Sequence, residues 1–364
     1  MSLPTIPEHP RTESRKEYLM TSSTGSFSAG PPTGCLAMFT GQGSQRPGMA
    51  GHLLDTYPSA RRLFAQADEI LGLPLSQICV TGSAEELART EITQPAVATT
   101  CLAIWDLLRA AGYRPATAAG HSLGEYPALV AAGVLPLEAA LKLVQLRGRL
   151  MGEVAREVPG AMAAVMGLSA DQVLAACGKA EGLGVVEIAN YNEPLQTVIS
   201  GHAAAVEEAG RVALEAGADR VAPLAVSAPF HCSLMSAVEA EFTEALAAQP
   251  FADPALPVIS SVTGSYIGSG EEARELLRRQ LTGPVRWVEV LRTAAQHPVG
   301  AYTEIGPGRV LSGLARRTLG EVEIRSTGEA RRLAALHGSL APDTDPPAAH
   351  TTPVGPSLAV IREG

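Results

Sequence analysis

The segment ATAAGHSLGEYPALVAA, residues 116–132, contains an apolar run, then a serine flanked by glycines, and then a second apolar run. Residues 116–120 predict a short buried strand, and residues 125–132 predict a helix. The GHSLG segment between them has the G-x-S-x-G pattern of a sharp strand-to-helix turn. Such a turn exposes its serine at a helix N-terminus, where free N–H groups favour developing negative charge. The strand–helix context disfavours a chance match in a glycine-rich chain, so Ser122 is the candidate nucleophile.

Strand and helix signals alternate on both sides of this turn. Further strands are expected at residues 35–39, 257–261 and 301–305, and helices at residues 95–111, 135–157, 272–280 and 285–296. This alternation predicts an α/β fold in which helices cover both faces of a sheet.

The middle of the chain has a different order of elements. Strands are expected at residues 161–168, 185–190, 197–200 and 220–226, and helices at residues 170–179 and 203–216. The order is βαββαβ, which is the ferredoxin-like arrangement. We therefore expect a ferredoxin-like subdomain inserted into the larger domain.

The domain boundaries follow from these patterns and from the composition of the two ends. Both ends are rich in small polar residues and proline, which is typical of flexible segments. We expect a flexible N-terminal tail at 1–34, the main domain at 35–158 and 228–330, the subdomain at 159–227 and a flexible C-terminal tail at 338–364.

Composition excludes several classes of function. The chain has 364 residues, of which 46% are hydrophobic, so it can bury a large core. Its formal net charge of −9 and scarce aromatic residues argue against nucleic-acid binding. It has five widely spaced cysteines without a C-x-x-C pair, which argues against a disulfide framework or a zinc site and favours a reducing cytoplasm. No apolar run reaches about 18 residues, so no membrane span is expected, and the N-terminus lacks a signal-peptide core.

A nucleophilic serine needs a base, and His231 is the best placed of the eight histidines. It follows the last strand of the predicted subdomain, where the chain returns to the main domain. A cleft between domains is a favoured place for a site. The alternative is a structural histidine.

Acyl transfer also needs donors for an oxyanion. The backbone N–H of Leu123, which follows the serine, is one candidate. The loop GQGSQ at residues 41–45 is the second, because its glycines allow close approach of the backbone to a substrate.

Arg147 lies in an apolar helical segment, LVQLRGRLM at residues 143–151, and a buried guanidinium needs an anionic partner. A substrate carboxylate is one candidate partner. An internal salt bridge is the other.

The ordered set of motifs resembles the malonyl-CoA:acyl carrier protein transacylases and the acyltransferase domains of polyketide and fatty acid synthases. The resemblance runs from about residue 35 to about residue 327, and it implies an α/β-hydrolase-like large domain with a ferredoxin-like insertion. Its markers are FTGQGSQRPGM, ITQPA, GHSLGEYPALVAAGVL, LRGRLM, GAMAAVMGL, VISG, SAPFHCSLM, RRQLTGPVRW and EIGPGRVLSGL.

The resemblance implies a malonyl transfer from malonyl-CoA to the phosphopantetheine thiol of acyl carrier protein, by a ping-pong mechanism and with no metal or resident cofactor. It implies a Ser122–His231 dyad, with His231 oriented by the backbone carbonyl of Gln280. It implies oxyanion-hole N–H groups from Gln42 and Leu123.

The resemblance also implies that Arg147 pairs with the malonyl carboxylate and that Gln94 lines the pocket. Phe230, directly before His231, favours malonyl over an α-methylated group. The preceding residues Ala228 and Pro229 depart from the common malonyl form and leave a substituted malonyl group open. His121, within the turn, is placed with these substrate-binding residues and is expected to pack against or orient the turn.

Two other functions are compatible with the sequence. One is a hydrolase that removes stalled acyl groups from carrier proteins, and the other is a non-enzymatic docking module. The pathway served, fatty acid or polyketide synthesis, stays open. Because carrier proteins are acidic, a local basic patch is also expected, with contributions from Arg278, Arg279, Arg286, Arg309, Arg316 and Arg317.

Overall fold

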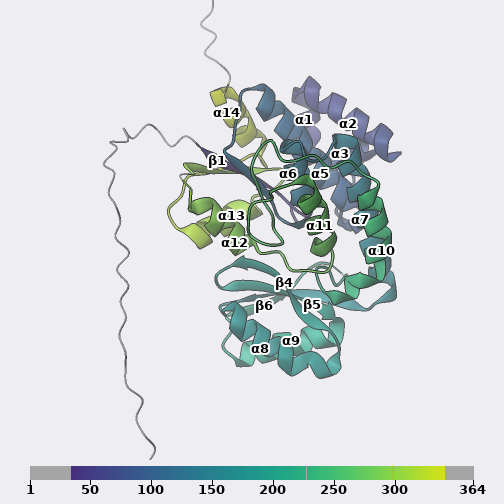
Figure 1. The fold of residues 1–364 in the computed structure, drawn as a ribbon, viewed down its shortest axis with the longest axis vertical. Coiled ribbons are helices and arrows are strands. Elements are labelled where there is room, and N and C mark those ends of the chain that lie inside the picture. The colour runs from purple at the N-terminus through teal and green to yellow at the C-terminus, as the bar shows by residue number, and fades with distance from the viewer. Residues whose placement is uncertain (1–33, 227, 298, 341–364) are drawn as a thin grey trace, which may run out of the picture. The chain divides into compact units, whose positions relative to one another are not determined.

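A five-stranded parallel sheet carries the serine turn (Figure 1). The computed structural model describes residues 34–226, 228–297 and 299–340. The strand order in this sheet is β7-β2-β1-β8-β9. Its strands are β1 (Cys35–Phe39), β2 (Thr117–Gly120), β7 (Val258–Ile259), β8 (Ala301–Ile305) and β9 (Ile324–Ser326).

The central strands of this sheet are short and buried. Every residue of β2 and β8 is buried, as expected for parallel strands covered on both faces. The strands predicted at 35–39 and 301–305 are confirmed, and the strand predicted at 116–120 begins one residue later. The strand predicted at 257–261 contains only two paired residues, and the three-residue strand β9 was not predicted.

Helices pack around this sheet and connect its strands. They are α1 (Gly51–Thr56), α2 (Pro58–Leu71), α3 (Leu75–Thr81), α4 (Ala84–Ala88), α5 (Thr90–Ala110), α6 (Glu125–Ala131), α7 (Leu137–Glu157), α10 (Glu239–Ala247), α11 (Gly270–Gln280), α12 (Trp287–Ala295), α13 (Val310–Leu319) and α14 (Ala330–Leu340). Short 3-10 turns lie at η1 (Ser122–Gly124), η2 (Glu181–Leu183) and η3 (Ser233–Val238). The α/β prediction is therefore confirmed.

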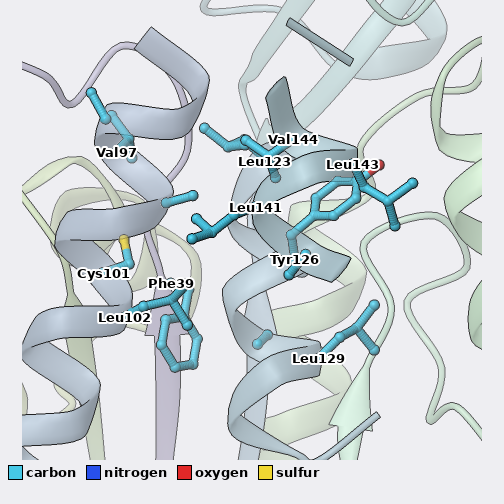
Figure 2. Packing of buried hydrophobic residues seen from close by; sticks show 14 of the residues in the cluster. Phe39, Val97, Cys101, Leu102, Leu123, Tyr126, Leu129, Leu141, Leu143 and Val144 are labelled. Atoms are coloured by element: carbon cyan, nitrogen blue, oxygen red, sulfur yellow. The ribbon is translucent and has the colours of Figure 1, made fainter. Parts of the chain in front are cut away.

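The largest hydrophobic cluster lies between the sheet and helices α5, α6 and α7. Figure 2 shows side chains of β1, α5, α6 and α7 meeting there. Phe39 of β1 packs edge-on against Trp105 of α5, with 5.9 Å between ring centroids. Leu123 and Tyr126, on either side of the turn's second glycine, are fully buried in the same cluster. The core thus anchors the residues that follow Ser122.

Helix α5 begins earlier than its sequence predicts. The periodicity of apolar residues predicts a helix over residues 95–111. It begins at Thr90 and contains Pro95. Proline lacks the N–H that would bond the carbonyl of Glu91, so one hydrogen bond of the helix is lost. Burial of nearly every residue from Ile92 to Leu108 outweighs that loss.

A second, antiparallel sheet follows α7. Its strands are β3 (Gly160–Met166), β4 (Val186–Glu193), β5 (Gln196–His202) and β6 (Arg220–Pro223), in the order β4-β5-β3-β6. Helices α8 (Ala170–Ala180) and α9 (Ala203–Glu215) lie side by side on one face of it (Figure 1). A separate hydrophobic cluster fills the space between these helices and the sheet.

The predicted domain boundaries stay a prediction, because the described residues all belong to one compact unit. Residues 1–33 and 341–364 of the predicted tails lie outside the described residues. The last three residues of α14 occupy the predicted start of the C-terminal tail, so the folded part extends to Leu340.

Candidate active site

Ser122 begins a tight turn at the end of β2. Its φ of 53° lies in the left-handed region, which residues other than glycine seldom adopt. A Cβ added at Gly120 would lie 1.9 Å from the backbone of Gly124. A Cβ added at Gly124 would lie 2.1 Å from the carbonyl oxygen of Phe39. The turn therefore requires both glycines, and it places the serine at the carboxyl end of the strand.

His231 forms a hydrogen-bonded pair with Ser122. Its Nε2 lies 2.6 Å from the Ser122 Oγ. Its Nδ1 lies 2.9 Å from the carbonyl oxygen of Gln280 and 3.2 Å from that of Gly283. Because carbonyl oxygens only accept, Nδ1 carries the hydrogen and Nε2 is left to accept the hydroxyl proton. No Asp or Glu among the described residues bonds this ring, so carbonyls orient the base.

His231 is held in its neutral form. Burial and, to a smaller extent, the positive charge of Arg147 lower its pKa from 6.5 to about 3, although the bond to the Gln280 carbonyl acts in the opposite direction. The side chain is only 5% exposed. Its own φ of 59° is a second left-handed conformation at this site. A neutral imidazole beside a serine hydroxyl is the form that a general base requires.

Two backbone N–H groups near Ser122 are unused. Neither the N–H of Gln42 nor that of Leu123 donates a hydrogen bond to another described residue. The Leu123 side chain is buried in the core, so only its backbone faces the turn. A Cβ added at Gly41 would lie 2.4 Å from the carbonyl oxygen of His121, so this loop approaches the turn closely. The role of these two N–H groups as oxyanion donors stays a prediction.

Arg147 extends from α7 to the serine. Its guanidinium donates to the Oε1 of Gln94 at 2.8 Å, to the Oγ of Ser122 at 3.1 Å and to the Oε1 of Gln280 at 3.2 Å. It also lies over the ring of Tyr126, 5.8 Å from the centroid. Burial lowers the pKa of Arg147.

The internal salt bridge considered for Arg147 is wrong. No Asp or Glu in the described part of the chain lies within 4.0 Å of the guanidinium, and its partners are neutral amides and a hydroxyl. A cation that is 98% buried without an anionic partner is costly. The site is therefore suited to an anionic group beside Ser122.

A cavity of about 390 Å³ joins these groups. Seven of the predicted site residues line it: Gln42, Gln94, His121, Ser122, Arg147, Phe230 and His231. The other two, Leu123 and Gln280, lie behind it. The His121 ring packs on Trp287, with 5.5 Å between centroids, and its Nε2 lies 2.8 Å from the Oδ1 of Asn192. These contacts fix the orientation of the His121 ring, and its role in orienting the turn stays a prediction.

Comparison with known proteins agrees with this geometry. The sequence pattern of the acyl transferase domain family matches residues 38–354. This chain belongs to the acyl transferase domain family.

Several relatives of this acyl transferase have names. The chain is 42% identical over 294 residues to the malonyl CoA-acyl carrier protein transacylase of Haemophilus influenzae, covering 80% of this chain and 94% of that protein. It is 39% identical, with a TM-score of 0.82, to a malonyl-transacylase solved in complex with a type II polyketide synthase acyl carrier protein. That match covers 84% of this chain and 100% of the other. An acyl carrier protein S-malonyltransferase from Vibrio cholerae is 41% identical with a TM-score of 0.79, covering 83% and 99%.

Sequence reasoning missed part of the acyl transferase site. The cavity is also lined by Met151 of α7, Met162 of β3, Asn190 of β4, and Leu224 and Val226 beyond β6. Strand periodicity marks Met162 and Asn190 as sheet residues but does not show that they face a cavity. Sequence reasoning also missed Glu125, whose buried carboxylate accepts a hydrogen bond from Gln280. A charge within an apolar helix, directly after the GHSLG turn, was the available signal.

The predicted basic patch is weakened by ion pairing. Arg278 pairs with Glu239 and Glu275, Arg286 with Glu289, Arg309 with Glu329, and Arg317 with Glu193. Arg279 and Arg316 make no ion pair with any described residue and are exposed. Paired cations contribute little net potential, so these two arginines are the stronger candidates for carrier contact.

None of the described helices is both long enough and apolar enough to cross a membrane. All five cysteines lie in the described part of the chain and are free thiols.

Proposed function

We propose that this acyl transferase moves a malonyl group from malonyl-CoA to the phosphopantetheine thiol of acyl carrier protein, through an ester on Ser122. The observation that carries the proposal is the buried guanidinium of Arg147, which lies 3.1 Å from the Ser122 Oγ and has no acidic partner among the described residues. A free acyl carboxylate supplies the missing anion. The named relatives support the same substrates.

The first half-reaction forms the acyl-enzyme. The Nε2 of His231 takes the Ser122 proton as the Oγ attacks the thioester carbonyl. The N–H groups of Gln42 and Leu123 donate to the oxyanion of the tetrahedral intermediate. Collapse breaks the C–S bond, and the imidazolium returns the proton to the departing CoA thiolate. The malonyl ester then keeps its carboxylate against Arg147.

The second half-reaction repeats these steps with a different thiol. His231 deprotonates the phosphopantetheine thiol of the carrier, and the thiolate attacks the ester carbonyl. The tetrahedral intermediate collapses with return of the proton to the Ser122 oxygen. Because one site serves both half-reactions, the kinetics are ping-pong. This chemistry requires no metal or resident cofactor, and it serves fatty acid or polyketide synthesis.

The finer description of the fold belongs to the same proposal. An α/β-hydrolase-like domain places the serine turn after an internal parallel strand, and β2 is such a strand here, between β7 and β1. The order β4-β5-β3-β6, with α8 and α9 on one face, supports a ferredoxin-like subdomain. Five free thiols fit a reducing cytoplasm.

The two alternative functions fit the site less well. A hydrolase for acyl carrier proteins gains nothing from a guanidinium 3.1 Å from its nucleophile. A non-enzymatic docking module needs neither a serine–histidine hydrogen bond of 2.6 Å nor two left-handed residues to hold it.

The choice of acyl group is testable by competition. Phe230 lines the cavity beside His231, and the resemblance implies that a phenylalanine at this position disfavours an α-methyl group. With equal malonyl-CoA and methylmalonyl-CoA, intact-mass spectrometry is expected to show mainly malonylated enzyme, and the acylated protein is expected to load an acyl carrier protein. Predominance of the methylmalonyl adduct would contradict the malonyl assignment.

The pH dependence of acylation follows from neutral His231. The active base is the deprotonated form, and its pKa in the folded protein is lowered from 6.5 to about 3. Acylation is therefore lost only as the pH falls toward 3, and the acid limb of kcat/KM lies well below 6.5. The measurement is the initial rate of acylation after a rapid jump from neutral pH.

The jump separates catalysis from unfolding. Because the unfolded state binds a proton at His231 that the folded state does not, stability is present above pH 6.5 and is lost as the pH falls below it. A jump assay records acylation before unfolding. An acid limb centred near 6.5 in that assay would show that His231 is not held neutral by its surroundings.

A further inference from the structure

Glu125 is a buried carboxylate directly behind the reacting groups. It begins α6 and is fully buried. Its Oε2 accepts from the N–H of Ser261 at 3.2 Å, the hydroxyl of Ser261 at 2.5 Å and the Nε2 of Gln280 at 2.7 Å. Its Oε1 has no partner among the described residues. The mechanism above makes no use of this side chain.

Gln280 connects Glu125 to each part of the catalytic machinery. Its Nε2 donates to Glu125 and to the carbonyl oxygen of Ser122 at 3.2 Å. Its Oε1 accepts from Arg147, and its backbone carbonyl accepts from His231. The side-chain amide has a donor end and an acceptor end, and only the acceptor end suits a guanidinium. A carboxylate, which accepts only, holds the donor end and so turns the acceptor end toward Arg147.

Glu125 also balances charge without occupying the arginine. Burial lowers the pKa of Arg147, and the negative charge of Glu125 acts in the opposite direction. A direct ion pair would fill the guanidinium donors that a substrate carboxylate needs. With the neutral amide of Gln280 between them, the two charges stabilise each other while Arg147 still faces the cavity.

We infer that Glu125 is a positioning residue that orients Arg147 through the side-chain amide of Gln280. In this way Glu125 sets the preference of the enzyme for acyl groups that bear a free carboxylate. The inference rests on the proposed malonyl transfer. It assigns to Glu125 an effect on the ratio of malonyl to acetyl acylation, because acetyl lacks the carboxylate that Arg147 binds.

The test is Glu125→Met, which keeps the length of the side chain and removes its acceptor. The ratio of kcat/KM for malonyl-CoA to that for acetyl-CoA is expected to fall by about 10- to 100-fold, the equivalent of one charged hydrogen bond. Glu125→Gln keeps an acceptor oxygen but no charge, so a smaller fall in the same direction is expected.

Glu304 provides a matched control. It is equally buried, and its Oε2 accepts from the hydroxyl and N–H of Ser312, while its Oε1 accepts from the N–H of Leu311 at the start of α13. Glu304→Met is expected to lower the unfolding temperature like Glu125→Met but to leave the malonyl-to-acetyl ratio unchanged. An equal fall of the ratio in both variants, or an unchanged ratio in both Glu125 variants, overturns the inference.

Gln280→Met provides an independent route if Glu125→Met does not fold. It removes the connecting amide and is expected to lower the same ratio, and adding Glu125→Gln is expected to lower it no further. Additive losses, or an unchanged ratio in Gln280→Met, contradict the inference. If wild-type protein forms no malonyl ester at all, the proposed function fails; if it does and the ratio does not respond, only the role of Glu125 fails.

Discussion

Ser122→Ala is expected to abolish covalent malonylation and to lower malonyl transfer by about 10⁴-fold or more. The variant keeps the cavity, Arg147 and the oxyanion N–H groups but lacks the oxygen that forms the ester. The measurement is intact-mass spectrometry after incubation with malonyl-CoA, combined with the rate of carrier loading. Wild type is expected to gain one malonyl group and the variant none.

The base and a remote serine complete this experiment. His231→Ala retains the Ser122 hydroxyl and is expected to acylate far more slowly, and the double variant is expected to be little worse than either single one. Ser312→Ala alters a buried serine at the start of α13, outside the cavity, and is expected to acylate normally. A malonyl adduct that persists in Ser122→Ala would mean that another residue is the nucleophile.

The parts of the site that could be predicted are those with a local physical requirement. The GHSLG turn has no room for a Cβ at Gly120 or Gly124. It therefore requires glycine at both positions, and this motif predicts the turn from the sequence. His231 stands where the chain leaves the antiparallel sheet, and short connections keep it near the main sheet. Backbone N–H donors follow from the turn itself.

The parts that could not be predicted depend on contacts between distant segments. Gln280 bonds Glu125 across 155 residues and the Ser122 carbonyl across 158, and no local pattern encodes such pairs. The salt bridge considered for Arg147 was wrong for the same reason. Charge pairing is the usual expectation for a buried guanidinium, whereas the fold supplies amides from α5 and α11.

The fold shows the same difference between features set by a local pattern and features set by distant segments. The buried strand β1 is an apolar run, and both β1 and the buried strand β8, which also contains Thr303 and Glu304, were predicted residue for residue. The two-residue strand β7 and the three-residue strand β9 are set by their neighbours in the sheet and have too few residues for a pattern. The short helices α1, α3 and α4 were likewise not predicted, because 6-, 7- and 5-residue helices span too few turns to establish periodicity. The helix α2 was also missed, although its 14 residues are enough to carry a pattern.

Arg147→Ala is expected to lower kcat/KM for acylation by malonyl-CoA by about 10²- to 10³-fold, because it removes a paired, charge-assisted contact with the substrate carboxylate. Acylation by acetyl-CoA is expected to change much less, since acetyl has no carboxylate to lose. The measurement is the acylation rate with each thioester at several concentrations. Thermal unfolding is measured alongside, because Gln94 and Gln280 lose a donor.

Arg149 supplies the matched control, since it lies two residues further along α7, is exposed, and pairs with Glu153 and Glu241. Arg149→Ala is expected to leave both acylation rates near those of wild type, because exposed ion pairs contribute little.

The result for Arg147→Ala also separates transfer from hydrolysis. A hydrolase of unsubstituted acyl groups has no carboxylate for Arg147 to bind, so its activity would survive the substitution. Equal losses with malonyl-CoA and acetyl-CoA would instead show that Arg147 supports the dyad without recognising a carboxylate. A selective loss of acylation by malonyl-CoA is the only one of these outcomes that shows recognition of the acyl carboxylate by the buried guanidinium.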